Sequence, residues 1–271
     1  EIIFKIRADN VEVPDKFMKV CRGDKQNWLT CSGELAYQWA KEALSLSQID
    51  IGAQHGAGWE SGMDNAARFG FINEQQLQDY ADKYHQGSLK QANKDWQVRI
   101  FENHNQQGEL VGYSIDQESV ELNSYLAHEK KLLSQLASII GKDKLSSRLL
   151  VEANQLSELI DKCFYDADSQ FYYDRQITAQ NGRGCHGRLL VNRGKGPEGW
   201  APLYTGVAAN EKAHQVISVM LNTKEFNSLI PFPTAALSNP AYHPDIYWRG
   251  RVWLDQFYFA WASLKRFFVS V

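Results

Sequence analysis

Residues 116–160 read DQESVELNSYLAHEKKLLSQLASIIGKDKLSSRLLVEANQLSELI, and this stretch decides the fold class. Its apolar residues recur three or four positions apart, which places them in one stripe on a long helix. Gly141 predicts the end of that helix, and Asp143 is positioned to cap a second one. The stretch therefore predicts two helices joined by a short turn, the unit of stacked or closed helical folds. The two stripes are Leu122, Tyr125, Leu126, Leu132, Leu133, Leu136, Ile139, Ile140 and then Leu145, Leu149, Leu156, Ile160.

The rest of the chain extends this mostly α prediction. Further helices are expected over 34–46, 74–84, 208–221 and 250–268. Residues 96–115, WQVRIFENHNQQGELVGYSI, alternate apolar and polar side chains around NQQG and predict a β-hairpin. Residues 169–177, SQFYYDRQI, are another strand candidate. No composition break indicates a linker, so residues 1–271 are expected to form one domain with small β insertions.

The composition argues against a nucleic-acid-binding protein and against a membrane protein. The chain has a hydrophobic content of 44% and a formal net charge of -3. These values are typical of a globular protein and give no basic surface for nucleic acid. The longest apolar runs are far shorter than the roughly 20 residues that span a bilayer, so no membrane partner is expected.

The four cysteines, Cys21, Cys31, Cys163 and Cys185, contain no CxxC pair, which argues against zinc and thioredoxin-type sites. Cys21 and Cys31 are close enough in sequence to close a small loop in an oxidising compartment. Free buried thiols are an equally good interpretation.

Three stretches combine glycine turns with tryptophan and charged residues: GWESGMDNAARFG (58–70), GKGPEGWAPL (194–203) and YWRGRVWLDQF (247–257). Aromatic rings with polar neighbours suit sugars, whose C–H faces stack on the rings. Plain packing explains such rings about equally well. For the first stretch, a helix start capped by Ser61 or Asp64 is the simpler interpretation.

Taken in order, WESGMD, GPEGWAPL and YWRGRVW resemble the bacterial α-glucosidases of glycoside hydrolase family 63, in the clan of trehalases and glucoamylases. The resemblance continues through FGFI, GYSIDQES, QFYYD, FNSLIPF and AALSNPAY, and so covers nearly the whole chain from about residue 50. It implies an (α/α)₆ barrel with the active site at one mouth, built from loops. The predicted helical hairpin suits this architecture.

The resemblance also implies a site. The family's general acid matches Asp64, which would donate a proton to the leaving oxygen in inverting hydrolysis of terminal α-glucosidic bonds. Burial beside Trp59 would raise the pKa of such an acid and keep it protonated. The remaining residues expected to bind the α-glucoside oligosaccharide are Trp59, Glu60, Glu198, Trp200, Trp248, Arg249 and Trp253.

The three motifs do not identify the second carboxylate, the general base. In the family the base is a glutamate in an ENY-type segment downstream of the WRG motif, and the chain shows no such segment. Glu198 and Asp245 lie in loops, but neither matches that base. The chain is therefore expected to be an interior part of a larger enzyme, an incomplete barrel without its last helices or an N-terminal β-sandwich.

Two further expectations follow from the resemblance. Glu118 matches a residue that helps to bind calcium in bacterial relatives, where the other ligands come from an Asp/Asn-rich loop upstream of the part seen here. A lone glutamate at a helix start is usually only a first-turn acid. DADSQ (166–170) lacks the glycine and the distal glutamate of a calcium loop and is expected to be a turn. By analogy alone, the protein is expected in the periplasm or secreted.

Two other functions remain open. One is a non-catalytic sugar-binding protein that keeps the aromatic cleft without the base. The other is a sugar epimerase or isomerase of similar barrel fold, which would rely on histidines. His55 and His243 lie near the motifs, but they do not form a recognisable pair.

Overall fold

The computed structural model describes residues 3–5, 54, 58, 61–177 and 185–268. The chain divides into two compact units. The described part of the larger unit is 66–97, 117–177 and 185–268, and that of the smaller unit is 3–5, 54, 58, 61–65 and 98–116. One domain over 1–271 stays a prediction. The expected helix over 34–46 and the residues Cys21, Cys31 and His55 lie outside the described residues.

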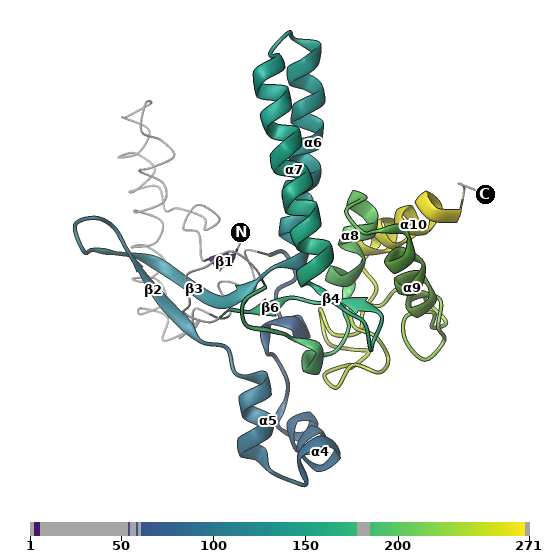
Figure 1. Cartoon of the computed structure of the whole chain (residues 1–271). Helices are drawn as coiled ribbons and strands as arrows, with labels where there is room; N and C mark the ends of the chain where they lie inside the picture. Colours follow the sequence, from purple (N-terminus) through teal and green to yellow (C-terminus); the bar gives the residue numbers. More distant parts are fainter. Residues whose placement is uncertain (1–2, 6–53, 55–57, 59–60, 178–184, 269–271) are drawn as a thin grey trace, which may run out of the picture. The chain divides into compact units, whose positions relative to one another are not determined.

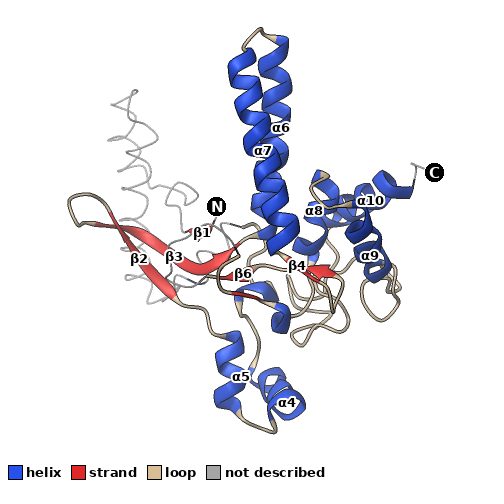
Figure 2. Cartoon of the chain, in the orientation of Figure 1, coloured by secondary structure: helices blue, strands red, loops and turns tan. Residues whose placement is uncertain are grey.

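The larger unit is mostly helical, as predicted (Figures 1 and 2). Its α-helices are α4 (Glu74–His85), α5 (Leu89–Trp96), α6 (Val120–Ile139), α7 (Asp143–Cys163), α8 (Ala201–Thr205), α9 (Asn210–Met220) and α10 (Leu254–Phe268). Its 3-10 helices are η2 (Ala67–Phe69), η3 (Val191–Arg193) and η4 (Pro197–Trp200). Its short strands are β4 (Tyr165–Asp166), β5 (Phe171–Tyr172), β6 (Arg175–Gln176) and β7 (Arg188–Leu189). In the part of the chain described here, no helix has the length and apolarity that crossing a membrane requires.

Helices α6 and α7 form the predicted hairpin (Figure 1). The Ser119 side chain caps α6 by accepting a hydrogen bond from the Leu122 N–H at 3.0 Å. Gly141, with φ +71°, ends it as predicted. Asp143 is the first residue of α7, and Lys142 occupies the cap position without a side-chain hydrogen bond, so the predicted Asp143 cap is wrong.

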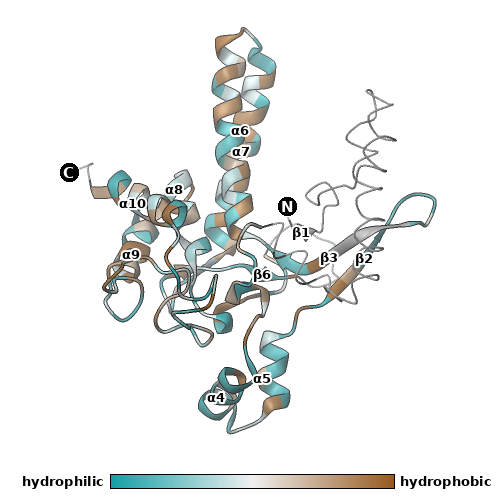
Figure 3. Ribbon diagram, turned by 180° about the vertical axis from the view of Figure 1, so that it is seen from behind, coloured by the Kyte–Doolittle hydropathy of each residue, from teal (hydrophilic) through white to brown (hydrophobic). Residues whose placement is uncertain are grey.

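The two helices of the hairpin pack through small side chains. Ala127, Ser134 and Ala137 of α6 and Ala153 of α7 are buried, and the Ser134 hydroxyl donates to the Ser146 carbonyl at 2.8 Å. The larger apolar residues of the predicted stripe are therefore exposed. They lie in the distal half of the hairpin, where Figure 3 colours parts of the ribbon brown. The exposed members are Leu132, Leu133, Leu136, Ile139, Ile140 and Leu145.

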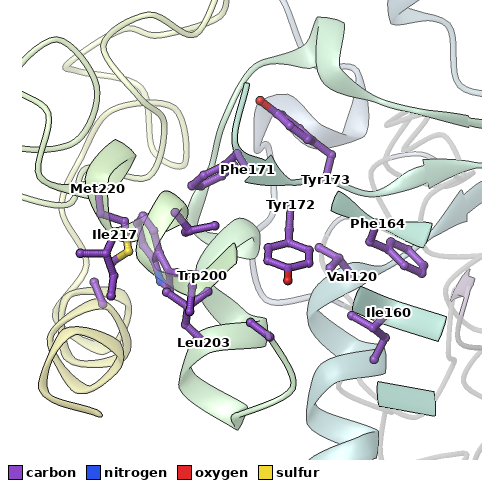
Figure 4. Close-up of a cluster of buried hydrophobic side chains, with 14 of the residues drawn as sticks. Val120, Ile160, Phe164, Phe171, Tyr172, Tyr173, Trp200, Leu203, Ile217 and Met220 are labelled. Atoms are coloured by element: carbon purple, nitrogen blue, oxygen red, sulfur yellow. The ribbon is translucent and has the colours of Figure 1, made fainter. Parts of the chain in front are cut away.

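The core of the larger unit gathers where α6, α7, α8, α9 and β5 meet (Figure 4). Phe171 stacks on Phe226 with ring centroids 5.7 Å apart, and the Trp200 ring meets Phe226 edge-on at 5.0 Å. Both Phe171 and Trp200 are almost completely buried. The core includes Val120, Ile160, Phe164, Tyr172, Tyr173, Leu203, Ile217 and Met220.

A disulfide joins Cys163, at the end of α7, to Cys185, 22 residues later. It ties the long helix to the segment that leads into β7 and η3. The Arg175 guanidinium donates a hydrogen bond to the Cys163 carbonyl. Both cysteines within the described residues are thus oxidised.

In the smaller unit, β2 (Ile100–His104) pairs antiparallel with β3 (Leu110–Glu118), and Ile100 lies opposite Ile115. The Asn105 side chain accepts hydrogen bonds from the Gln107 and Glu109 N–H groups and closes the turn. The predicted hairpin around NQQG is therefore confirmed. β1 (Ile3–Lys5) belongs to the same sheet.

The last two residues of β3 belong to the larger unit. Gln117 and Glu118 pair there with β6, and β6 pairs in turn with β7. The strand predicted over 169–177 is divided into β5 and β6. Helices were correctly predicted near α4, α9 and α10, whereas α5 was not predicted.

Candidate active site

The segment around Asp64 is a chain of tight turns in the smaller unit. The Ser61 hydroxyl donates to the Gly58 carbonyl and accepts from the Met63 N–H at 3.0 Å. Gly62 has φ +74°, a conformation that glycine adopts at little cost. The nearest helix, η2, is capped by Ala66, so neither Ser61 nor Asp64 caps a helix. A short helix does begin in this stretch, at Ala67, but the predicted caps Ser61 and Asp64 are wrong.

Asp64 is a half-buried carboxyl on a strained backbone. Its φ of 26° is unusual for a residue with a side chain. Burial raises the pKa of the Asp64 carboxyl, and a hydrogen bond from its own backbone N–H partly offsets the rise. A carboxyl in such a setting holds its proton to a higher pH than an exposed one, as a general acid requires. Trp59 and Glu60 lie outside the described residues.

Arg68 forms the centre of a buried charged cluster. It follows Asp64 by four residues and belongs to the larger unit. Its Nε and Nη2 atoms bind both carboxylate oxygens of Asp174 at 2.8 Å. Its Nη1 binds Glu121 at 2.7 Å, and Nη2 also donates to Ser119. All four side chains are buried. The fork of the guanidinium thus holds two carboxylates that lie far apart in the sequence.

A second arginine supports the backbone of this cluster. Arg193 Nη1 donates to the Arg68 carbonyl at 2.8 Å and to Gln117 Oε1 at 2.7 Å. Gln117 Nε2 donates to the same carbonyl and to Asp174 at 2.6 Å. The main chain of the WESGMDNAARFG motif is therefore anchored, at Arg68, by two buried side chains from other elements.

Glu198 lies on η4 and is 3% exposed. Its carboxyl fills the space in front of Gly196, where any Cβ would overlap it. On the other side of the turn, a Cβ at Gly199 would overlap the Phe171 ring. Burial raises the pKa of the Glu198 carboxyl to about 7, with Asp174 and Glu121 adding to the rise and Arg68 opposing it. A side chain at Gly199 would therefore displace the Phe171 ring, and one at Gly196 would displace the Glu198 carboxyl.

Two of the three tryptophans of the later motifs form an aromatic platform. Trp248 and Trp253 stack with centroids 5.5 Å apart and planes 15° apart, and Tyr247 packs edge-on against Trp253 at 4.8 Å. The Trp253 Nε1–H donates to the Tyr247 carbonyl at 3.0 Å. Trp248 is buried, whereas Trp253 is partly exposed. Trp200, by contrast, packs in the core described above, so the structure separates it from this platform.

Arg249 lies between the tryptophans in sequence and is half-buried. Its Nη1 donates to the Phe71 carbonyl at 3.1 Å. Within the described residues its Nε is buried without a hydrogen-bond partner, and no carboxylate pairs with its guanidinium. Burial lowers the pKa of the Arg249 guanidinium, although not enough to deprotonate an arginine. A cation in this state can bind an anionic or hydroxyl-rich ligand.

Glu118, the residue expected to bind calcium, is a buried carboxylate at the end of β3. Glu118 is 7% exposed and lies in register with Arg175 across β3 and β6. Across the described ranges, no group of three or more His, Cys, Asp or Glu side chains could hold a metal ion. Calcium at Glu118 therefore stays a prediction. DADSQ is a turn, as predicted, because Asp166 accepts from the Ser169 N–H and hydroxyl.

The other loop candidates are separate from the buried cluster. Asp245 is exposed, and its N–H donates to His243 Nδ1 at 3.2 Å. Sequence reasoning selected Asp64, Glu198 and Arg249 but missed Arg68 and its partners. The signal for Arg68 was its place inside the first motif. Two of its partners, Ser119 and Asp174, end the matching segments GYSIDQES and QFYYD, but nothing in the sequence indicated that they contact Arg68.

A family model described as "Mannosylglycerate hydrolase MGH1-like glycoside hydrolase domain" matches residues 37–269. Among solved structures, the chain is similar to the family 63 mannosylglycerate hydrolase from Thermus thermophilus in complex with glucose. The TM-score is 0.50 and the identity 17%, covering 94% of this chain and 59% of that one. An uncharacterized conserved protein from Thermus thermophilus gives a TM-score of 0.50 and 16% identity, covering 96% and 61%. These likenesses support the mostly α, (α/α)₆-barrel type of fold.

A curated relative, an uncharacterized protein of Borreliella burgdorferi, is 22% identical over 126 residues, which cover 46% of this chain and 24% of that protein. The match spans about a quarter of that relative, and about three fifths of each solved structure is covered.

Proposed function

Because the chain belongs to the MGH1-like glycoside hydrolase domain family, we propose that it hydrolyses α-glycosidic bonds with inversion and that Asp64 is the general acid. The observation that carries this proposal is the setting of Asp64. It combines a half-buried carboxyl, a pKa raised by burial and a strained turn within the region that the family model matches. Strain at a single residue is a frequent property of functional sites.

In the proposed reaction, Asp64 gives its proton to the glycosidic oxygen as the bond from that oxygen to the anomeric carbon breaks. A water attacks the anomeric carbon from the opposite face, and a second carboxylate removes the water's proton. No residue of this chain is proposed as that base. Glu198 does not suit that role, because a base must be ionised and its burial favours the neutral form.

The Trp248–Trp253 platform and Arg249 are proposed to bind the sugar. The expected substrate is a short α-glucoside oligosaccharide. The alternative substrate is a mannosylglycerate, because the similar Thermus thermophilus protein is described as a mannosylglycerate hydrolase. One observation favours that alternative, since Arg249 has no carboxylate partner in the described chain and a substrate carboxylate would supply one.

The experiment that tests this function follows the stereochemistry of the first product. Proton NMR of early hydrolysis, using the natural polypeptide with an α-glucoside and with α-mannosylglycerate, should show the β anomer of the released sugar before mutarotation. The substrate that is turned over identifies the specificity. Appearance of the α anomer first would contradict the assigned mechanism. Tight binding of either compound without turnover would instead favour a non-catalytic sugar-binding protein.

Arg249→Lys separates a binding role from a packing role. Lysine keeps the charge but loses the planar fork, so the catalytic efficiency should fall more than tenfold, above ~1.4 kcal/mol in transition-state stabilisation. The melting temperature should hardly change, because the Arg249 guanidinium makes a single hydrogen bond to the residues that the structure describes, at the Phe71 carbonyl. Steady-state kinetics and thermal unfolding measure the two effects.

The matched control is Arg251→Lys, two residues along the same motif and exposed. It should leave both measurements near the wild-type values. Equal kinetic losses in the two variants, or a loss at Arg249 that follows unfolding, would give Arg249 a structural role.

An extracellular or periplasmic location is also proposed. The Cys163–Cys185 disulfide supports it, because disulfides persist mainly in oxidising compartments.

A further inference from the structure

The buried cluster around Arg68 contains more acidic than basic groups. Arg68 and Arg193 contribute two positive charges, whereas Glu121, Asp174 and Glu198 would contribute three negative charges if all were ionised. Each of the five side chains is at most 4% exposed. An uncompensated charge in such a place costs several kcal/mol, so within these residues one carboxyl is expected to keep its proton.

The hydrogen bonds identify which carboxyl this is. Glu121 and Asp174 each receive an ion-paired hydrogen bond directly from the Arg68 guanidinium, at 2.7 and 2.8 Å. Glu198 takes part in no ion pair among the described residues. Its carboxyl lies against the Gly196 backbone and interacts with its own N–H. Burial raises the pKa of Glu121 as well, but the ion pair and hydrogen bond from Arg68 oppose that rise. Glu198 has no such partner among the described residues, so a negative charge there would be the least compensated of the three.

We propose that Glu198 is a positioning residue that acts as a neutral carboxyl beneath the turn 194–200 and leaves Arg68 fully bound to Glu121 and Asp174. The proposal rests on the proposed function only where it concerns catalysis. When Glu198 ionises, it competes for Arg68 with the two carboxylates already bound. Arg68 follows Asp64 by four residues, so a shift of Arg68 disturbs the segment that carries the general acid.

The groups that face Glu198 come from several elements. η2 contributes Arg68, and α6 contributes Glu121, whose carboxylate also accepts from the Tyr125 hydroxyl. The segment after β5 contributes Asp174 and Tyr173. The charges among them are one cation and two carboxylates, and their balance favours the neutral form of Glu198.

The sign of the pH effect follows from the two pKa values of Glu198. Its pKa is 4.5 in the unfolded chain and about 7 in the folded one, so the folded state binds the proton more tightly. The associated stability is fully present below about pH 4.5. It is lost progressively as the pH rises to about 7. Glutamine cannot ionise, so Glu198→Gln should remove this dependence.

The test is thermal unfolding from pH 4.5 to 9, compared with the pH profile of kcat, for the natural polypeptide and its variants. The wild-type melting temperature should fall by roughly 5 °C more than that of Glu198→Gln between pH 4.5 and 8. In Glu198→Gln, the decrease of kcat at high pH should begin at least one pH unit higher than in the wild type. Glu198→Asp keeps a titratable carboxyl and should keep the fall, and Glu158→Gln, an exposed glutamate on α7, serves as the control.

Two outcomes would overturn the proposal. One is a pair of parallel pH curves for wild type and Glu198→Gln. The other is a folded Glu198→Gln variant without activity at any pH, which would require an ionised Glu198. If that variant does not fold, Glu121→Gln removes one negative charge from the cluster and should move the loss of stability to lower pH. Thermal unfolding needs no turnover, so failure to hydrolyse a glycoside would contradict the proposed function and leave this inference standing.

Discussion

Replacing Asp64 with asparagine is expected to lower kcat by about 10²–10⁴-fold, because the variant cannot donate a proton to the leaving oxygen. Sugar binding should change little, since the amide has nearly the size of the carboxyl. The positive φ at residue 64 also favours asparagine, so the turn should survive the substitution. Steady-state kinetics with a natural α-glycoside, together with a binding titration, measures both effects.

The choice of leaving group provides the internal control. A glycosyl fluoride needs little protonation to leave, so its hydrolysis by Asp64→Asn should be reduced far less than that of the natural substrate. Asp168→Asn, at an exposed aspartate in the turn after β4, should behave like wild type. Near-normal turnover of a poor leaving group by Asp64→Asn would exclude Asp64 as the acid.

The largest loss of stability is expected from Arg68→Met. Methionine fills part of the volume but leaves Glu121 and Asp174 buried without their cation. Removing one member of a buried charged group typically costs about 3–5 kcal/mol. Denaturant unfolding should show this loss. Arg188→Met breaks a partly exposed ion pair with Asp95 and should cost less than ~1 kcal/mol.

If Arg68→Met does not fold, a triple variant keeps the prediction testable. Arg68→Met combined with Glu121→Gln and Asp174→Asn removes all three charges together and should recover part of the lost stability. Equal effects of Arg68→Met and Arg188→Met would mean that the cluster contributes no more than a surface pair.

The helical elements were the most predictable part of this fold. The spacing of apolar residues predicted α6 and α7, and the glycine at 141 predicted the turn between them. The same spacing did not predict which face would be buried. Small residues such as Ala137 and Ser134 allow the two helices to approach closely, and the larger Leu136 and Ile139 then lie outside. A hydrophobicity pattern places the large apolar residues in the contact, so it does not predict a contact made by small residues.

The candidate site was predictable only where local sequence carries the chemistry. Asp64 and Arg249 stand in recognisable motifs. The partners of Arg68 are 53 and 106 residues away, and no local pattern indicates a contact at such a separation. Trp200 and Trp253 also look alike in sequence, because each is near a glycine turn, yet one ring is in the core and the other is partly exposed. Only the packing distinguishes them.

The disulfide between Cys163 and Cys185 has a practical consequence for handling the protein. A single proteolytic cut anywhere between these two residues leaves two fragments that stay covalently joined. Electrophoresis without a reducing agent would therefore show one intact band, and the cut would become visible only after reduction. A preparation judged homogeneous on a non-reducing gel should also be examined with dithiothreitol, since nicked and intact molecules have nearly the same mass until the bond is broken.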